Sequence, residues 1–267
     1  NSLSEIIEIY MDDLVGNPIY EKFGNFFPLL IKFIDANDKL SVQVHPNDDL
    51  AFEEHGTFGK TEMWYIMQAN EGAGLYIGFN KELNASELKK IIENNKIEEV
   101  LNFVPVKEGD VVFLPAGRIH AIGAGLLIAE IQQTSDITYR LYDWNRVDQN
   151  GKPRQLHIEQ ALKAIDYSFI QEPKINYQIL PNNSVELVSC QYFTTNIIEV
   201  TTTIEKDYGY IDSFVVLICV KGKVMIEPYL QESVELNIGE TILIPEEINN
   251  LYIKPFENST LLEIYIK

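Results

Sequence analysis

The chain has 267 residues, which is enough for one large domain or two small ones. Apolar residues make up 46% of it and charged residues 23%, and these ordinary globular proportions exclude a disordered or collagen-like protein. Its 21 basic residues against 40 acidic residues give a net charge of -19, so we expect neither duplex nucleic acid nor a membrane surface as a partner.

The two cysteines, Cys190 and Cys219, each lie in an apolar, strand-like run. Two cysteines are too few for a disulfide framework, so we expect a reducing, cytoplasmic compartment. The longest apolar runs are too short to cross a bilayer, and the first residues do not resemble a signal peptide. The first residue is not methionine, which leaves a natural N-terminal segment open.

The predicted elements alternate between helices and many short strands. Helical spacing and capping residues predict helices at 4–15, 84–103 and 155–167. Alternating and apolar runs predict two strands around a turn within 29–45, and further strands at 62–68, 73–79, 110–114, 126–133 and 137–143. A linker is predicted at 171–184, which contains two prolines, and residues 185–267 have the short strands of a sandwich or barrel.

A weak internal repeat relates the two halves of the chain. Residues 106–115 resemble residues 236–245, and residues 62–67 resemble residues 212–217. The two offsets, 130 and 150, differ by about the length of the helical stretch 84–103. We therefore predict a mainly β fold with two barrels. The first barrel, residues 1–170, contains the helices, and the linker 171–184 follows it. Residues 185–267 form a degenerate second barrel, in which Asn250 stands in place of a histidine.

Ser41, Gln43 and His45 point the same way if residues 41–45 form a strand with period two. If the intervening valines face one layer of a barrel, these polar groups face its interior. A metal would satisfy a buried imidazole and an amide oxygen together. The alternative, a solvent-facing polar strand face, is slightly favoured by this strand alone.

Glu62 opens an apolar strand, and Lys60 lies two residues earlier, on the same face if the strand extends that far. The carboxylate could bind a metal and the ammonium a substrate anion, although a capping acid and a solvated lysine are commoner. His120 follows a Pro-Ala-Gly turn and begins the next strand, so it could face the same interior. His55 and His157 are interpreted as surface or helix-face residues.

Glu130 ends one predicted strand and Arg140 lies in the next, so a hairpin would bring them close together. One interpretation is a structural ion pair. The other is a general base beside a guanidinium that binds an anionic group.

Four motifs follow one another: Gln43-Val-His45-Pro, Gly59-Lys60-Thr-Glu62-x-Trp64, Pro115-Ala-Gly-x-x-His120, and Glu130 with Arg140 ten residues later. Their order and spacing resemble the type I mannose-6-phosphate isomerase family in its short bacterial form. The resemblance covers about residues 35–165 by motif and 185–267 by general pattern. It implies a cupin fold, with two antiparallel jelly-roll barrels and a catalytic zinc in the first.

The resemblance implies one zinc ion per chain, bound by His45, Glu62 and His120, with Gln43 as a less secure fourth ligand. It implies interconversion of mannose 6-phosphate and fructose 6-phosphate, by proton transfer through an enediol. The residues it marks as catalytic are Arg140, Glu130 and Lys60, and those it marks as contacting the substrate are Ser41, Lys60 and Arg140. Arg118 would add positive charge near the site.

The chain departs from the family pattern at two points. Residues 47–49 are Asn-Asp-Asp where long-form members often have a lysine, and members normally begin a few tens of residues earlier, with a Trp-Gly-Gly strand. We therefore expect either an incomplete chain or a shortened protein whose barrel edge is covered by another segment. The alternatives are a non-catalytic metal- or sugar-binding cupin, and a different cupin enzyme such as a dioxygenase, which the motifs disfavour. We expect a monomer or homodimer.

Overall fold

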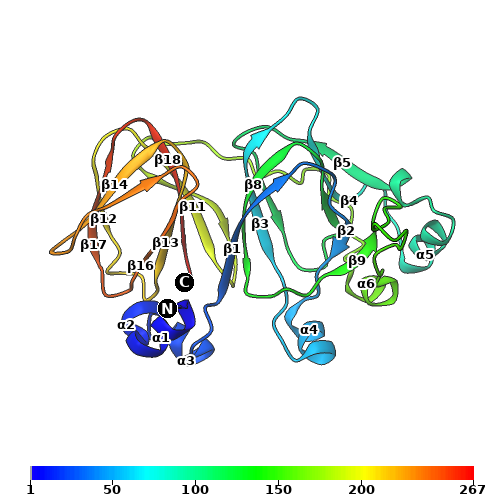
Figure 1. Ribbon diagram of the computed structural model, residues 1–267, viewed down its shortest axis with the longest axis horizontal. Helices are drawn as coiled ribbons and strands as arrows, with labels where there is room; N and C mark the ends of the chain where they lie inside the picture. Colours follow the sequence, from blue (N-terminus) through cyan, green and yellow to red (C-terminus); the bar gives the residue numbers. More distant parts are fainter. Residues whose placement is uncertain (1) are drawn as a thin grey trace. The chain divides into compact units, whose positions relative to one another are not determined.

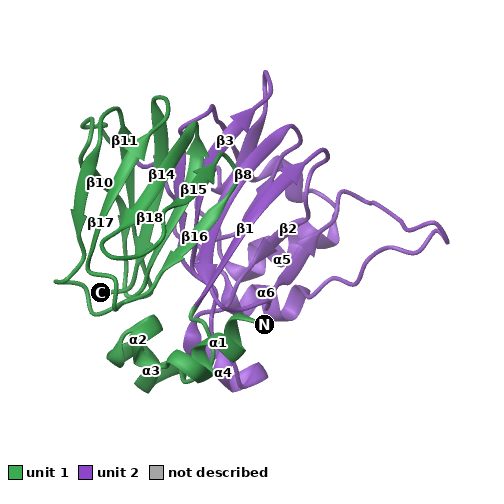
Figure 2. Ribbon diagram, turned by 60° about the vertical axis from the view of Figure 1, so that its left-hand side comes forward, with its two compact units in different colours: residues 1–28, 176–267 green, residues 29–175 purple. Residues whose placement is uncertain are grey.

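The computed structural model describes residues 2–267 and divides into two compact units (Figures 1 and 2). Unit 2 is Leu29–Ile175, and unit 1 combines the residues up to Pro28 with Asn176–Lys267. Each unit contains two antiparallel sheets, so the predicted mainly β fold with two barrels is confirmed. Among the described residues, no helix combines the length and apolar character needed to cross a membrane.

The barrel of unit 2 is made of a four-stranded and a five-stranded sheet. The first has the order β1 (Leu29–Ala36), β8 (Leu126–Gln133), β3 (Glu62–Ala69), β6 (Val111–Leu114). The second has the order β5 (Leu101–Pro105), β4 (Gly74–Phe79), β7 (His120–Ile122), β2 (Val42–Val44), β9 (Tyr139–Tyr142). Trp64 and Ile128 from the first sheet share a buried core with Leu75 and Ile122 from the second. The two sheets therefore face one another, as in a sandwich.

Strands β8 and β9 lie in different sheets of unit 2, so the hairpin considered between residues 126–133 and 137–143 does not form. Strand β8 pairs with β1 and β3, whereas β9 pairs with β2. Side chains hold the connecting segment: Gln132 Nε2 donates to the Ser135 carbonyl at 2.7 Å, and the Ser135 hydroxyl donates to the Phe58 carbonyl at 2.9 Å. These bonds direct the chain out of the first sheet, so no tight turn forms.

The barrel of unit 1 has the same construction (Figure 1). Its first sheet has the order β10 (Ser184–Ser189), β11 (Thr194–Val200), β18 (Ser259–Tyr265), β13 (Val215–Lys221), β16 (Thr241–Ile244). Its second has the order β12 (Ile204–Asp207), β17 (Asn250–Pro255), β14 (Lys223–Pro228), β15 (Val234–Asn237). Leu217, Leu251 and Leu261 are among the apolar side chains that fill the space between them.

Three helices begin the chain: α1 (Leu3–Tyr10), α2 (Asp12–Val15) and α3 (Asn17–Phe23). Ser2 and Glu5 form the capping box of α1, and Met11, with φ at 49°, interrupts the single helix that the sequence predicts at 4–15. Pro18 lies in the first turn of α3, where proline is well tolerated. These helices belong to unit 1, whereas the sequence placed the first of them in the N-terminal domain.

The remaining helices lie in unit 2: α4 (Asp48–His55), α5 (Ala85–Glu93) and α6 (Ile158–Ala164), with a 3-10 turn, η1, at Ile97–Glu99. The helix predicted at 84–103 is therefore too long. Leu101 is buried in the core and pairs with Phe79 of β4, which draws the end of this stretch into the sheet as β5.

The strand registers identify equivalent positions in the two barrels. Leu114 and Ile244 each precede the proline of the repeat; the first pairs with Glu62 and the second with Val215. The equivalent of Glu62 is therefore Val215, and the sequence alignment with Asp212 is wrong by three residues. Asp212 lies before the strand, where its carboxylate accepts a hydrogen bond from the Asn17 backbone N–H.

Candidate metal centre and active site

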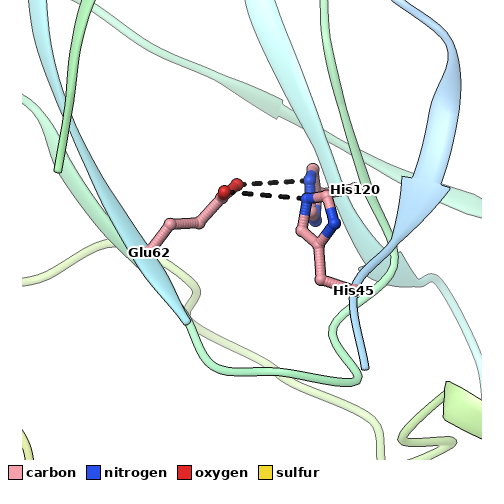
Figure 3. Close-up of side chains that lie close together, drawn as sticks. All are labelled: His45, Glu62 and His120. Atoms are coloured by element: carbon pink, nitrogen blue, oxygen red, sulfur yellow. Dashed lines mark ion pairs between the residues drawn. The ribbon is translucent and has the colours of Figure 1, made fainter. Parts of the chain in front are cut away.

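Three residues that the sequence marks as metal ligands lie together inside the barrel of unit 2 (Figure 3). His45 follows β2, Glu62 opens β3, and His120 opens β7. All three are buried, and their ligand atoms lie within 4.8 Å of one another. The Nε2 atom of His45 is 3.6 Å from one Glu62 oxygen, and that of His120 is 3.3 Å from the other. The two sheets thus bring a carboxylate against two imidazoles.

Backbone carbonyls orient both imidazole rings. The Nδ1 atom of His45 is 2.8 Å from the carbonyl of Ile137, and that of His120 is 2.8 Å from the carbonyl of Arg118. A carbonyl can only accept, so each Nδ1 carries the proton and each Nε2 faces Glu62 with a lone pair. Burial lowers the pKa of both histidines, and Lys60 adds to the lowering at His45, so the rings are held neutral as metal ligands must be.

The donor set fits a divalent cation. Neither carboxylate oxygen of Glu62 accepts a well-directed hydrogen bond from a described residue, although both are buried. The nearest positive charge is Lys60 Nζ, which lies 2.9 Å from a Glu62 oxygen and 3.0 Å from His45 Nε2. Two imidazole nitrogens and a carboxylate that converge in a buried space are a donor set typical of zinc and related metals. Lys60 thus lies beside Glu62, although β3 begins at Glu62 and does not extend to residue 60.

Gln43 and Arg140 lie on the same face of the second sheet as His120. Gln43 pairs with His120 on one side and with Arg140 on the other, and directly paired residues share a face. The Gln43 amide nitrogen is 3.3 Å from His120 Nε2. Ser41 is buried just before the same strand. The polar strand face considered from the sequence is therefore turned inward rather than to solvent.

The Arg140 guanidinium has an N–H donor from which no described residue accepts a hydrogen bond. One terminal nitrogen donates to the Gln155 carbonyl at 2.9 Å, while the buried Nε has no hydrogen-bond partner among the described residues. Burial and the neighbouring Arg154 lower its pKa. The sequence treated Arg118 as a further positive group at the site, but its guanidinium lies 3.1 Å from Asp166 instead.

The Glu130 carboxylate does not pair with Arg140. It is buried, accepts a hydrogen bond from Trp64 Nε1 at 3.0 Å, and lies 2.7 Å from Lys32 Nζ. Lys32 was not identified from the sequence. The signal was present, because Lys32 shares one strand face with the apolar residues Leu30 and Ile34, and a lysine on an apolar face indicates a buried polar partner.

The two remaining histidines lie outside the cluster. His55, exposed at the end of α4, has its Nε2 2.9 Å from the Tyr139 hydroxyl. His157 is half-buried before α6, and its Nδ1 accepts a hydrogen bond from the Arg140 backbone N–H at 3.1 Å. It therefore supports the strand that carries Arg140.

Comparison with known proteins gives consistent relatives. A family model described as phosphomannose isomerase type I, catalytic domain, matches residues 1–70. Mannose-6-phosphate isomerase of Streptococcus mutans is 47% identical over 149 residues, which are 54% of this chain and 47% of that protein. ManA, the mannose-6-phosphate isomerase of Bacillus subtilis, is 44% identical over 174 residues, 64% of this chain and 55% of that protein. The chain therefore spans about half the length of these two relatives.

A longer match and two solved structures complete the comparison. YvyI of Bacillus subtilis, named for the same activity, is 32% identical over 235 residues, 86% of this chain and 73% of that protein. The crystal structure of mannose 6-phosphate isomerase from Bacillus subtilis has a TM-score of 0.80 at 29% identity, over 93% of this chain and 81% of the other. A phosphomannose isomerase structure from Salmonella typhimurium, with a TM-score of 0.80 at 16% identity over 100% of this chain and 86% of the other, supports the fold alone. By its sequence relatives and its cupin fold, this chain belongs to the type I phosphomannose isomerase family.

Proposed function

We propose that the protein is a zinc-dependent aldose–ketose isomerase that interconverts mannose 6-phosphate and fructose 6-phosphate. The observation that carries the proposal is the buried group of His45, Glu62 and His120, in which neutral imidazoles face a carboxylate that accepts no well-directed hydrogen bond from a described residue. Family membership supplies the reaction and the substrate class. We expect it to act in the cytoplasm as a monomer or homodimer.

In this proposal His45, Glu62 and His120 bind one zinc ion, and Gln43 supplies a fourth ligand. Rotation of the Gln43 amide by half a turn would present its oxygen in place of the nitrogen that now faces His120. Zinc bound there polarises a carbonyl oxygen and stabilises the negative charge that develops on it. Lys60, now beside Glu62, would then be free to turn its ammonium toward the substrate.

The substrate contacts follow from donors on the inner face of the barrel. Arg140 has an unused buried N–H, and its guanidinium suits the oxygens of a sugar phosphate. Ser41 and Lys60 add a hydroxyl and an ammonium from the same interior. These groups give positive charge inside a protein whose net charge is -19, and in a low-dielectric interior local charges dominate binding.

The proton transfer is assigned to Glu130. Its carboxylate removes the proton from C2 of the open-chain aldose and returns it to C1, while the hydroxyl proton on O2 passes to O1 through an enediol. Burial beside Trp64 and Lys32 holds the carboxylate in one orientation. Lys60 and Arg140 stabilise the negative charge on the substrate oxygens during the transfer.

The test is a coupled assay for conversion of fructose 6-phosphate to mannose 6-phosphate, with the metal content measured on the same sample. We expect turnover that disappears with a chelator and returns when zinc is added. Zinc binding at one ion per chain without turnover would contradict the isomerase proposal and favour the non-catalytic binding protein.

A further inference from the structure

Three neighbouring strands place Lys32, Glu130 and Trp64 in one row across the first sheet of unit 2. Lys32 on β1 pairs directly with Glu130 on β8, and Glu130 pairs directly with Trp64 on β3. The two outer residues bind different oxygens of the carboxylate: Trp64 Nε1 donates to Oε1 and Lys32 Nζ to Oε2. The row therefore fixes both the position and the plane of the Glu130 carboxylate.

Trp64 also contacts the metal centre. It is fully buried, and its indole meets the His120 ring edge-on, with 5.2 Å between ring centroids and an interplanar angle of 89°. One rigid side chain thus packs against a candidate metal ligand and donates a hydrogen bond to the candidate base. A flexible side chain could not hold two groups at a fixed separation in this way.

The second barrel provides an internal comparison, because Glu263 is the equivalent of Glu130. Glu130 pairs with Trp64, two residues after Glu62, and Glu263 pairs with Leu217, two residues after Val215. Four side chains donate to the Glu263 carboxylate: Ser184 and Asn196 to one oxygen, Tyr208 and Lys206 to the other.

A carboxylate has about four acceptor positions, so Glu263 is saturated. Glu130 has only Trp64 and Lys32 as described partners, and it therefore keeps acceptor capacity. Equivalent positions in the two barrels thus hold two different carboxylates: Glu263 has all its acceptor positions filled, and Glu130 has acceptor positions left for another group.

We propose that Trp64 is a positioning residue, whose indole N–H holds the Glu130 carboxylate in the orientation needed for proton transfer. The inference rests on the proposed function, since it concerns the base of that reaction. Trp64 itself does not contact the reacting atoms. Its action is to prevent the carboxylate from rotating away while Lys32 holds the second oxygen.

The hydrogen bond is tested without reference to activity by nuclear magnetic resonance of protein labelled at the tryptophan indole nitrogens. The chain has two tryptophans, Trp64 and Trp144, so two indole signals are expected, and Trp64→Phe assigns them by loss of one. Glu130→Gln should shift the Trp64 proton signal upfield, because a neutral acceptor forms a weaker hydrogen bond than a carboxylate. The matched change Glu263→Gln in the second barrel should leave both signals in place.

The catalytic consequence is tested by kinetics. Trp64→Phe keeps an aromatic ring at this position and removes the N–H donor together with one ring of the indole, so we expect kcat to fall by about tenfold or more with an unchanged KM and zinc content. Tyr208→Phe removes one donor from Glu263 in the same manner and should leave kcat at the wild-type value.

Two results would overturn the inference. One is that Glu130→Gln moves neither indole signal, which is informative even if Trp64→Phe fails to fold. The other is a normal kcat in Trp64→Phe beside an active wild type. A zinc-loaded wild type without any turnover would instead overturn the proposed function itself.

Discussion

The two buried histidines make the stability of the metal-free protein depend on pH. Burial lowers the pKa of His45 and His120 in the folded state, whereas in the unfolded chain each has the ordinary value of about 6.5. The unfolded state therefore binds more protons as the pH falls, and the stability contributed by neutral rings is present above about pH 6.5 and is lost below it. We expect the urea midpoint of chelator-treated protein to fall between about pH 7.5 and about pH 5.5.

The control for this pH dependence is His120→Asn, which removes one of the two titrating rings. The fall in the midpoint should become smaller in this variant. An equal fall in both proteins would show that other groups cause it.

Removal of a single ligand should abolish metal binding. His120→Ala takes away one of three buried donor groups, and we expect the zinc content to drop from about one ion per chain to nearly none. His55→Ala is the matched control, because His55 is exposed and lies outside the cluster. Plasma emission on both dialysed proteins provides the measurement. Retention of zinc by His120→Ala would remove His120 from the ligand set.

At the scale of elements, the segment between β2 and β3 sets the distance between His45 and Glu62. Its ends are fastened by two hydrogen bonds: the Lys60 backbone N–H donates to the Pro46 carbonyl at 3.0 Å, and the Gly59 N–H donates to the Asp48 carboxylate at 2.8 Å. The sequence interpretation gave Asp48 only as part of the Asn-Asp-Asp segment where long-form members often have a lysine. In the structure this side chain closes the segment that contains α4.

A side chain at Gly59 should disturb this closure. An added Cβ would lie 2.6 Å from the backbone of Asn47 and Asp48, so Gly59→Ala must separate the two ends. We expect zinc affinity to fall by about tenfold or more. Gly56→Ala is the matched control: its Cβ meets nothing within 4 Å, and its left-handed backbone costs stability, about 1 kcal/mol, without moving a ligand. Competition with a fluorescent chelator measures both affinities.

The sequence predicts most strands of unit 2 because strands depend on local patterns. The alternation at residues 41–45 predicts one face for Gln43 and His45, and in the structure both side chains lie close to His120. Sheet pairing depends on distant contacts, so the separation of Glu130 from Arg140 could not be obtained from their spacing. The same holds for the carbonyls that orient the histidines, since Ile137 lies 92 residues from His45.

At the scale of the whole molecule, each unit has its own buried polar centre: the Glu263 network in unit 1 and the group of His45, Glu62 and His120 in unit 2. A substitution in one centre should therefore leave the properties of the other unchanged. Burial raises the pKa of Glu263, but Lys206, Asn196 and Ser184 stabilise its ionised form, and the net effect is a lowered pKa. Glu263→Gln removes the charge opposite Lys206, and we expect a loss of about 3 kcal/mol from the unfolding free energy of unit 1.

Zinc content is the second readout for Glu263→Gln and should be unchanged, because the ligands lie in unit 2. Added zinc should raise the unfolding temperature of unit 2 in wild type and variant alike. Urea and thermal unfolding followed with and without zinc measure both effects. A variant of normal stability would mean that the Glu263 network contributes little to the fold.

The crossing from β8 to β9 has a consequence for the orientation of His45. Residues 134–138 leave one sheet and enter the other, and on the way they supply the carbonyl that aims the His45 ring. Because the contact is made by the backbone carbonyl of Ile137, the orientation of the His45 ring depends on the path of the segment and not on the identity of its side chains. A changed length in this crossing would therefore be expected to turn the His45 ring while every candidate ligand is kept.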